Sequence, residues 1–183
     1  MKKLWPVRGL AALVFLAVGL AGCDPQRISE LEEGVASEAD VRARFGAPEQ
    51  VWEARDMAGL PGAGSAALPG ARTLEYSRQP AGHTNYLITI GSDGKMSALR
   101  QTLTPQNLQR VVPGMSLEQV RKMLGRPMKV TPFALTRETH HDWRYLSDPN
   151  TSRIFTAVFD ADLRVVRTGS VDDDRGESGG DKR

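Results

Sequence analysis

Three adjacent polar residues, His140, His141 and Asp142, are the positions where this chain comes closest to a metal site. Imidazole and carboxylate groups bind zinc when their spacing lets them converge on one ion. We expect this stretch to be a strand, in which neighbouring side chains point to opposite faces. His140 and His141 then cannot chelate one ion together. We therefore predict no metal site and interpret these residues, like His83 in an expected turn, as solvated polar groups.

Other patterns of catalytic chemistry are missing from the sequence. No G-x-S-x-G elbow joins a predicted strand to a helix, since the one match to this pattern, Gly176 to Gly180, lies in the polar tail. The glycine-rich stretch from Gly59 to Gly70 lacks the Lys-Ser/Thr of a phosphate-binding loop. We interpret that stretch as a flexible inserted loop. We predict that the chain is not an enzyme and needs no cofactor.

Cys23, the only cysteine, follows Leu20-Ala21-Gly22 at the end of a short apolar run. This arrangement resembles a bacterial lipobox, where a diacylglyceryl group is attached to the cysteine and the leader is removed. We predict Cys23 as the site of lipid attachment, with palmitate among its acyl chains. A lone cysteine leaves the fold without an internal disulfide, so an apolar core must hold it together.

Residues 1–22 have the parts of an export signal, with a basic start at Lys2, Lys3 and Arg8 before an uncharged segment. That segment is shorter than the roughly 20 apolar residues of a spanning helix. An ordinary secretory signal or an uncleaved anchor is the alternative. Removal of the leader leaves 21 basic against 22 acidic residues, a net charge of −1. We therefore expect no nucleic-acid partner, which would require a clustered basic face.

An internal repeat organises the rest of the chain. Ser37 and Val41 to Pro48 match Ser116 and Val120 to Pro127 at a constant offset of 79. A second block, from Leu74 to Asp93, matches Trp143 to Asp162 at an offset of 69. The insertion at Gly59 to Gly70 accounts for the difference. We predict a first unit over 23–104, a second unit over 105–171 and a disordered tail over 172–183.

Each unit has signals for helices followed by strands. Ser37 and Ser116 begin capping patterns, and Gly46 and Gly125 stand where left-handed residues end helices. We predict helices over 37–45 and 116–124, and shorter helical turns over 26–33 and 105–112. Strands are predicted over 51–54, 72–77, 86–90, 96–102, 128–133, 153–159 and 163–170. The expected fold class is α+β: two tandem αα-βββ units with helices packed on an antiparallel sheet.

The pattern G-M-S-x-x-Q-V-x-x-x-L-G-x-P at Gly114 to Pro127, with Trp143-Arg144-Tyr145 and the later hairpin, resembles the SmpA/OmlA (BamE) family of small lipoproteins. The resemblance covers the second unit well and the first loosely. It implies a non-enzymatic accessory protein of the machinery that assembles β-barrel outer membrane proteins. The tandem arrangement resembles the β-lactamase-inhibitor-like fold, which implies two units that form a concave sheet.

The family resemblance also implies partners and a location. The partners would be subunits of the barrel-assembly complex, the membrane through N-terminal acyl chains, and phosphatidylglycerol. The location would be the outer membrane, facing the periplasm. Asp24 after Cys23 keeps the periplasmic face of the inner membrane as an alternative. A tethered inhibitor-like or ligand-binding module, or a paralogue with a different partner, is the alternative function, and an envelope hydrolase is a third hypothesis.

Aromatic residues recur at matching positions in the two units. Tyr76 matches Tyr145, and Tyr86 matches Phe155, whereas Trp143 has no aromatic counterpart. Such side chains stabilise a core by roughly 1.5–3 kcal/mol each when buried. Tyrosine and tryptophan are also common anchors of protein interfaces. Core packing is one interpretation, and an exposed interface that includes Trp143, Tyr145 and Tyr76 is the other.

Overall fold

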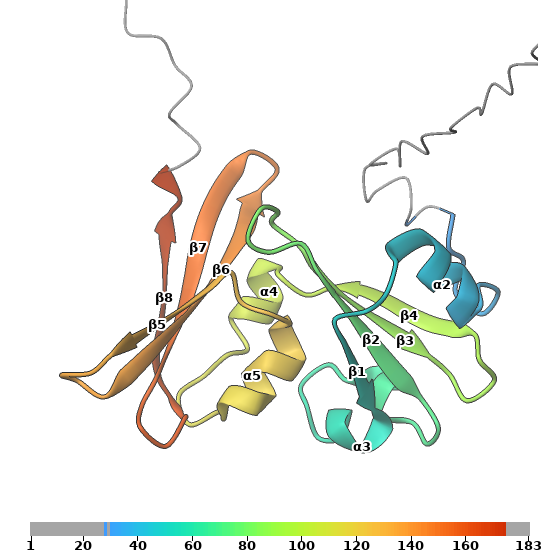
Figure 1. The fold of residues 1–183 in the computed structure, drawn as a ribbon, viewed down its shortest axis with the longest axis horizontal. Coiled ribbons are helices and arrows are strands. Elements are labelled where there is room, and N and C mark those ends of the chain that lie inside the picture. The colour runs from blue at the N-terminus through green and yellow to red at the C-terminus, as the bar shows by residue number, and fades with distance from the viewer. Residues whose placement is uncertain (1–27, 29, 175–183) are drawn as a thin grey trace, which may run out of the picture.

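The computed structural model describes residue 28 and residues 30–174 of the chain (Figure 1). Its elements are a helix and a sheet with two short helices between the first and second strands, followed by two helices and a second sheet. They are α2 (Glu38–Phe45), β1 (Gln50–Glu53), α3 (Ala54–Met57), the 3-10 helix η1 (Gly64–Ala67), β2 (Arg72–Ser77), β3 (Asn85–Ile90), β4 (Met96–Gln101), α4 (Pro105–Leu108), α5 (Leu117–Leu124), β5 (Lys129–Phe133), β6 (Glu138–Asp148), β7 (Thr151–Phe159) and β8 (Val165–Asp172).

The eight strands form two separate antiparallel sheets of four strands each. The first sheet has the order β1-β2-β3-β4 and the second has the order β5-β6-β7-β8. The predicted α+β class is confirmed, with one sheet and its helices in each unit. The single concave sheet implied by the tandem resemblance is not formed, because α4 and α5 lie between the two sheets (Figure 1).

The two main helices begin where the sequence predicts. Ser37 caps α2 through a capping box with Asp40, and Ser116 caps α5 in the same way with Gln119. Both helices end at a glycine with positive φ, Gly46 at 85° and Gly125 at 79°. Their ψ angles of −158° and −170° differ from the left-handed helical cap that we expected. The chain therefore leaves each helix in an extended direction towards the next strand.

The repeat predicted from the sequence is visible in the backbone. Ser37 forms an isolated antiparallel bridge with Lys95, and Ser116 forms the same bridge with Arg164. The N–H of Gly34 donates to Met96 O at 2.7 Å, as Gly114 N–H donates to Val165 O at 2.8 Å. In each unit, the helix start is thus tied to the last hairpin of its own sheet.

The first sheet is covered on both faces. One face packs on α2 through a core that includes Val41, Phe45, Leu74 and Ile88. The other face carries Leu87, which packs in a smaller cluster with Met57, Ala63 and Ala66. All six residues of β3 are buried as a result.

This second cluster corrects the prediction of a flexible loop at Gly59 to Gly70. The insertion contains η1, and Ala66 within it is fully buried. Its small side chains allow a close approach to the sheet, so the insertion forms a cover over the first sheet. The preceding helix α3 has no counterpart among the predicted elements.

Three further predictions are modified at element ends. The helical turn expected over 105–112 is shorter, with α4 ending at Leu108. The turn expected over 26–33 lies partly outside the described residues. Asp172 ends β8 and Asp173 is buried, so disorder from residue 172 onwards is wrong for these two positions. Arg144 Nε holds Asp173 Oδ2 at 2.7 Å, which explains why this carboxylate stays with the fold.

Candidate interaction surface

The three aromatic residues predicted as a possible interface are all buried. The exposed fraction is 0% for Trp143, 5% for Tyr145 and 2% for Tyr76. Trp143 Nε1 donates to Gly125 O at 3.0 Å, and Tyr76 Oη donates to Gly46 O at 3.2 Å. Trp143 and Tyr76 thus tie each sheet to the end of its helix, and Tyr145 Oη donates to Ser170 Oγ within the second sheet at 3.2 Å. All three side chains belong to the core and are not accessible anchors for a partner.

The predicted lipid-attachment residue, Cys23, and the leader before it lie outside the described residues. Among the residues that are described, no helix combines the length and apolar character needed to cross a membrane. They also contain no group of three or more histidine, cysteine and acidic side chains that could hold a metal ion.

One histidine, His141, is buried, although we expected all of them to be solvated. His141 is 8% exposed and packs edge-on against Phe159, with ring centroids 4.9 Å apart. Burial lowers its pKa, and the nearby carboxylate of Asp142 opposes that shift. His140 lies on the other side of the strand against Phe133, at a centroid distance of 4.2 Å. The two imidazoles therefore do not share a site.

A buried carboxylate joins the two units. Glu75 on β2 has an exposed fraction of 0% and forms an ion pair with Arg121 of α5. It also accepts hydrogen bonds from the N–H of Arg126 at 2.8 Å and from Trp52 Nε1 at 3.3 Å. A buried charge requires such partners, since an unpaired one is strongly destabilising. Glu75 thus fixes the end of α5 against the first sheet.

Two buried side chains near Glu75 complete this junction. Asn85 Nδ2 donates to the carbonyl oxygens of Leu124 and Arg126, both at 2.9 Å. Thr102 Oγ1 donates to Leu124 O at 2.8 Å. The last carbonyls of a helix have no partner within the helix. Here the first unit supplies those partners to α5 of the second unit.

The loop between β2 and β3 makes a second contact with the second sheet. Gln79 Nε2 donates to Arg144 O at 2.8 Å, and Gln79 Oε1 accepts from Arg144 N–H at 3.2 Å. The pairing of β5 with β6 stops at Asp142, so the Gln79 amide occupies the position that a neighbouring strand would take. His83 Nε2 lies 3.0 Å from Ser152 Oγ on β7.

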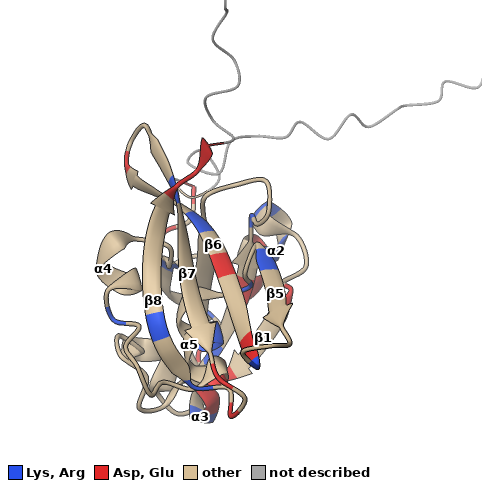
Figure 2. Ribbon diagram, turned by 90° about the vertical axis from the view of Figure 1, so that its left-hand side faces the viewer, with Lys and Arg blue, Asp and Glu red and all other residues tan. Residues whose placement is uncertain are grey.

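One broad surface is left uncovered by the described part of the chain: the outer face, which we define as the side of the second sheet away from α5. Figure 2 shows it with β5, β6, β7 and β8 side by side. The pairing register places five of its side chains across all four strands: Phe133, His140, Thr156, Arg167 and Val171. Phe133 is 44% exposed and Val171 is 61% exposed. The face therefore combines accessible apolar groups with charged ones.

An ion pair spans the outer face from β6 to β8. Arg167 donates to both carboxylate oxygens of Glu138, at 2.6 and 2.8 Å. This contact is the main reason why the pKa of Glu138 falls to about 2, and it raises the pKa of Arg167. Both groups remain charged across the neutral range. Protein interfaces combine apolar side chains with a polar rim and are enriched in aromatic residues and arginine. The outer face offers groups of each kind.

Sequence reasoning missed this surface and the junction because each is assembled from strands that are distant along the chain. The alternation of side chains along β6 could have indicated the outer face, since Glu138, His140 and Asp142 share one side of the strand. No sequence signal distinguishes Glu75, which is buried, from a carboxylate on an open face.

The second unit matches a known family. Residues 101–169 match the family model described as the outer membrane protein assembly factor BamE domain. No curated protein matches the chain. Among solved structures, the chain is similar to the crystal structure of a DUF4309 family protein (YjgB) from Bacillus subtilis subsp. subtilis str. 168. That likeness has 19% identity and a TM-score of 0.29 over 81% of this chain and 86% of the other chain, so it supports no argument about function.

Proposed function

We propose that this chain is an accessory protein of the β-barrel outer membrane protein assembly machinery that acts by binding other proteins. The observation that carries the proposal is the match of residues 101–169 to the BamE domain. The protein would be anchored by acyl chains on Cys23 and would face the periplasm from the outer membrane. It would act without catalysis, with barrel-assembly subunits as its partners and phosphatidylglycerol as a further ligand.

The outer face of the second sheet is the surface that we assign to this binding. The equivalent face of the first sheet already binds another element of this protein: Glu75 and Asn85 on that face contact α5. The repeat offset of 69 places Arg144 and Ile154 of the second sheet at the positions of these two residues. In the second unit no element of the described chain covers most of that face, so it is available to another protein.

The alternative of an inhibitor-like or ligand-binding module predicts several exposed aromatic residues on a concave sheet. Tyr76, Tyr86, Trp143, Tyr145 and Phe155 are at most 5% exposed. We therefore prefer the assembly accessory, in which binding uses the mixed outer face.

A pull-down from solubilised envelopes tests the proposed partner and surface together. The double variant Phe133→Ser with Val171→Ser removes two exposed apolar groups of the outer face. It should lower the recovery of barrel-assembly subunits at native expression. The control, Leu135→Ser, alters a fully exposed leucine in the turn after β5 and should leave recovery unchanged. Recovery of unrelated partners alone would reject the function, and equal recovery with all variants would reject the surface.

The lipid anchor has a separate test. Cys23→Ser should block leader processing or release the protein from membranes, because the thiol is the attachment point. Fractionation of envelopes on a density gradient then assigns the unmodified protein to the outer or the inner membrane. A Cys23→Ser protein that is processed and membrane-bound like the parent would contradict the anchor.

A further inference from the structure

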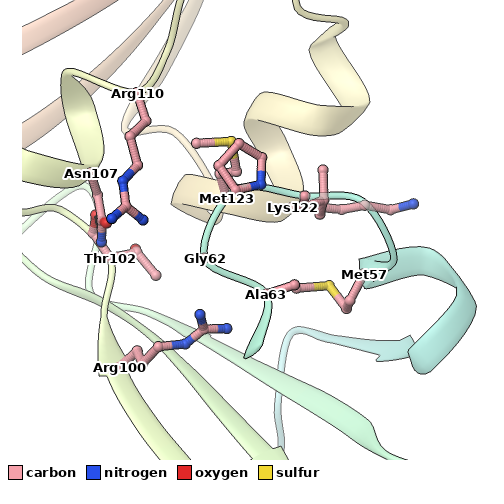
Figure 3. Close-up of a pocket in the computed structure, with 11 residues that line it drawn as sticks. Met57, Gly62, Ala63, Arg100, Thr102, Asn107, Arg110, Lys122 and Met123 are labelled. Atoms are coloured by element: carbon pink, nitrogen blue, oxygen red, sulfur yellow. Dashed lines mark hydrogen bonds between the residues drawn. The ribbon is translucent and has the colours of Figure 1, made fainter. Parts of the chain in front are cut away.

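A cavity of about 170 Å³ lies where the two units meet, beneath the insertion (Figure 3). Five segments form its wall: the end of α3, the insertion around Gly62, the end of β4 and the residue after it, the region of α4, and α5. The polar residues among them are Arg100, Thr102, Asn107, Arg110 and Lys122. None of the residues that line the cavity is acidic. Its charged groups are therefore all cationic.

Two of these cations converge on one point, and no acidic side chain of the described residues pairs with either of them. A Cβ atom added to Gly62 would lie 2.6 Å from Arg110 Nη1 and 3.8 Å from Arg100 Nη1. Both guanidinium groups thus approach the same stretch of insertion backbone, as Figure 3 shows. The third cation, Lys122, is engaged elsewhere: its Nζ pairs with Glu118 at 2.5 Å.

The approach of Arg100 and Arg110 to each other destabilises the protein when no anion is bound between them. Arg100 Nε is buried and has no hydrogen-bond partner among the described residues. Burial lowers the pKa of Arg100, and the charge of Arg110 adds to the shift. Two like charges with an unsatisfied buried donor destabilise a fold unless an anion joins them.

We propose that Arg100 and Arg110 form a binding site for the phosphate group of a small phosphate monoester. Guanidinium groups donate in a planar fork that fits phosphate oxygens. A phosphate monoester carries a charge of about −1.5 to −2 at neutral pH, which balances two arginines, whereas a carboxylate or a phosphodiester balances one. The absence of a side chain at Gly62 leaves room for the Arg110 guanidinium to lie against the insertion, beside the cavity that would hold the phosphate. This site is independent of the outer face and of the proposed assembly role.

Calorimetric titration of the purified full chain with inorganic phosphate, at pH 7.5 and low ionic strength, tests the site. The parent should bind one phosphate, and acetate should bind at least tenfold more weakly. Arg100→Gln and Arg110→Gln should each weaken phosphate binding by tenfold or more. The control Arg137→Gln, on an exposed turn of the second sheet, should bind like the parent.

Thermal unfolding without phosphate separates binding from folding. Each pocket variant should unfold at the same temperature as the parent or higher, because the repulsion between the two arginines is relieved. A lower unfolding temperature for both would show a structural role and overturn the proposal. So would unchanged phosphate binding by both variants, or equal weakening in Arg137→Gln. Binding to vesicles of an anionic phosphodiester lipid that depends on Arg100, without binding of phosphate, would replace the monoester by a lipid headgroup.

Discussion

Replacing Glu75 by alanine should reveal how strongly the two units are coupled. The change removes an ion pair with Arg121 and leaves two donors, Arg126 N–H and Trp52 Nε1, without their acceptor. Breaking a buried pair by removing one partner costs about 3–5 kcal/mol. The Arg121 side chain is 27% exposed and can regain some water, which moves the expectation towards the lower value. The N–H of Arg126 is only part-buried, so losing its acceptor adds less than the roughly 1–3 kcal/mol of a fully buried unpaired donor.

We therefore expect Glu75→Ala to lower the free energy of unfolding by roughly 3–5 kcal/mol. For a chain of this size, that corresponds to a fall in the unfolding temperature of roughly 6–20 °C. Urea unfolding followed by tryptophan fluorescence and by circular dichroism measures both the loss and any separation of the two units. Glu75→Gln keeps a neutral acceptor and should lose roughly 1–2 kcal/mol, since hydrogen bonds to charged groups are stronger by about that amount.

A matched control is Glu138→Gln, which removes a carboxylate from an exposed ion pair on the second sheet. It should change the unfolding free energy much less than Glu75→Ala at pH 7. If Glu75→Ala loses less than about 1 kcal/mol, the reasoning from buried pairs does not apply at this junction. A loss no larger than that of Glu138→Gln would lead to the same conclusion.

Further predictions concern other parts of the fold. Gly125→Ala should destabilise more than Gly46→Ala in urea unfolding: both glycines have positive φ, but only the Gly125 Cβ would meet a neighbour, Asn85 Nδ2 at 3.0 Å. Trp143→Ala should cost about 3–5 kcal/mol, as a fully buried aromatic residue does, and a loss below 2 kcal/mol would contradict its core role. Burial lowers the pKa of His141 in the folded state, so the unfolded chain takes up its proton first as pH falls and stability declines below the ordinary pKa of 6.5. The parent should therefore lose more unfolding free energy between pH 7.5 and pH 5.5 than His141→Phe, and an equal loss in the two proteins would refute this cause.

The parts of the fold that depend on neighbouring residues could be predicted from the sequence. The capping boxes at Ser37 and Ser116 require only residues three positions apart, and both are present. The strand over 72–77 is confirmed to the residue. The sequence repeat predicted that the two units share one backbone arrangement. The equivalent bridges from Ser37 to Lys95 and from Ser116 to Arg164 agree with this prediction.

The parts that depend on distant contacts could not be predicted. Glu75 is 46 residues from Arg121, and a strand carboxylate is normally assigned to solvent. The insertion has the composition of a loop, yet Ala66 within it packs against the first sheet. In both cases another element, distant along the chain, buries the residue. The neighbouring sequence does not indicate where that element lies. Arg100 and Arg110 come together for the same reason.

With the proposed lipid anchor at Cys23, the packing of the N-terminal segment would keep the first unit near the membrane. Ile28 and Leu31 pack against the core of the first unit beside α2. A chain spans at most about 3.3–3.6 Å per residue, so an anchor at Cys23 would hold Ile28 within roughly 18 Å of the acyl attachment. The α2 end of the molecule would then lie close to the lipid headgroups. The outer face is at the opposite end of the long axis (Figure 1), so the same short tether would leave this face as the part of the molecule farthest from the attachment point.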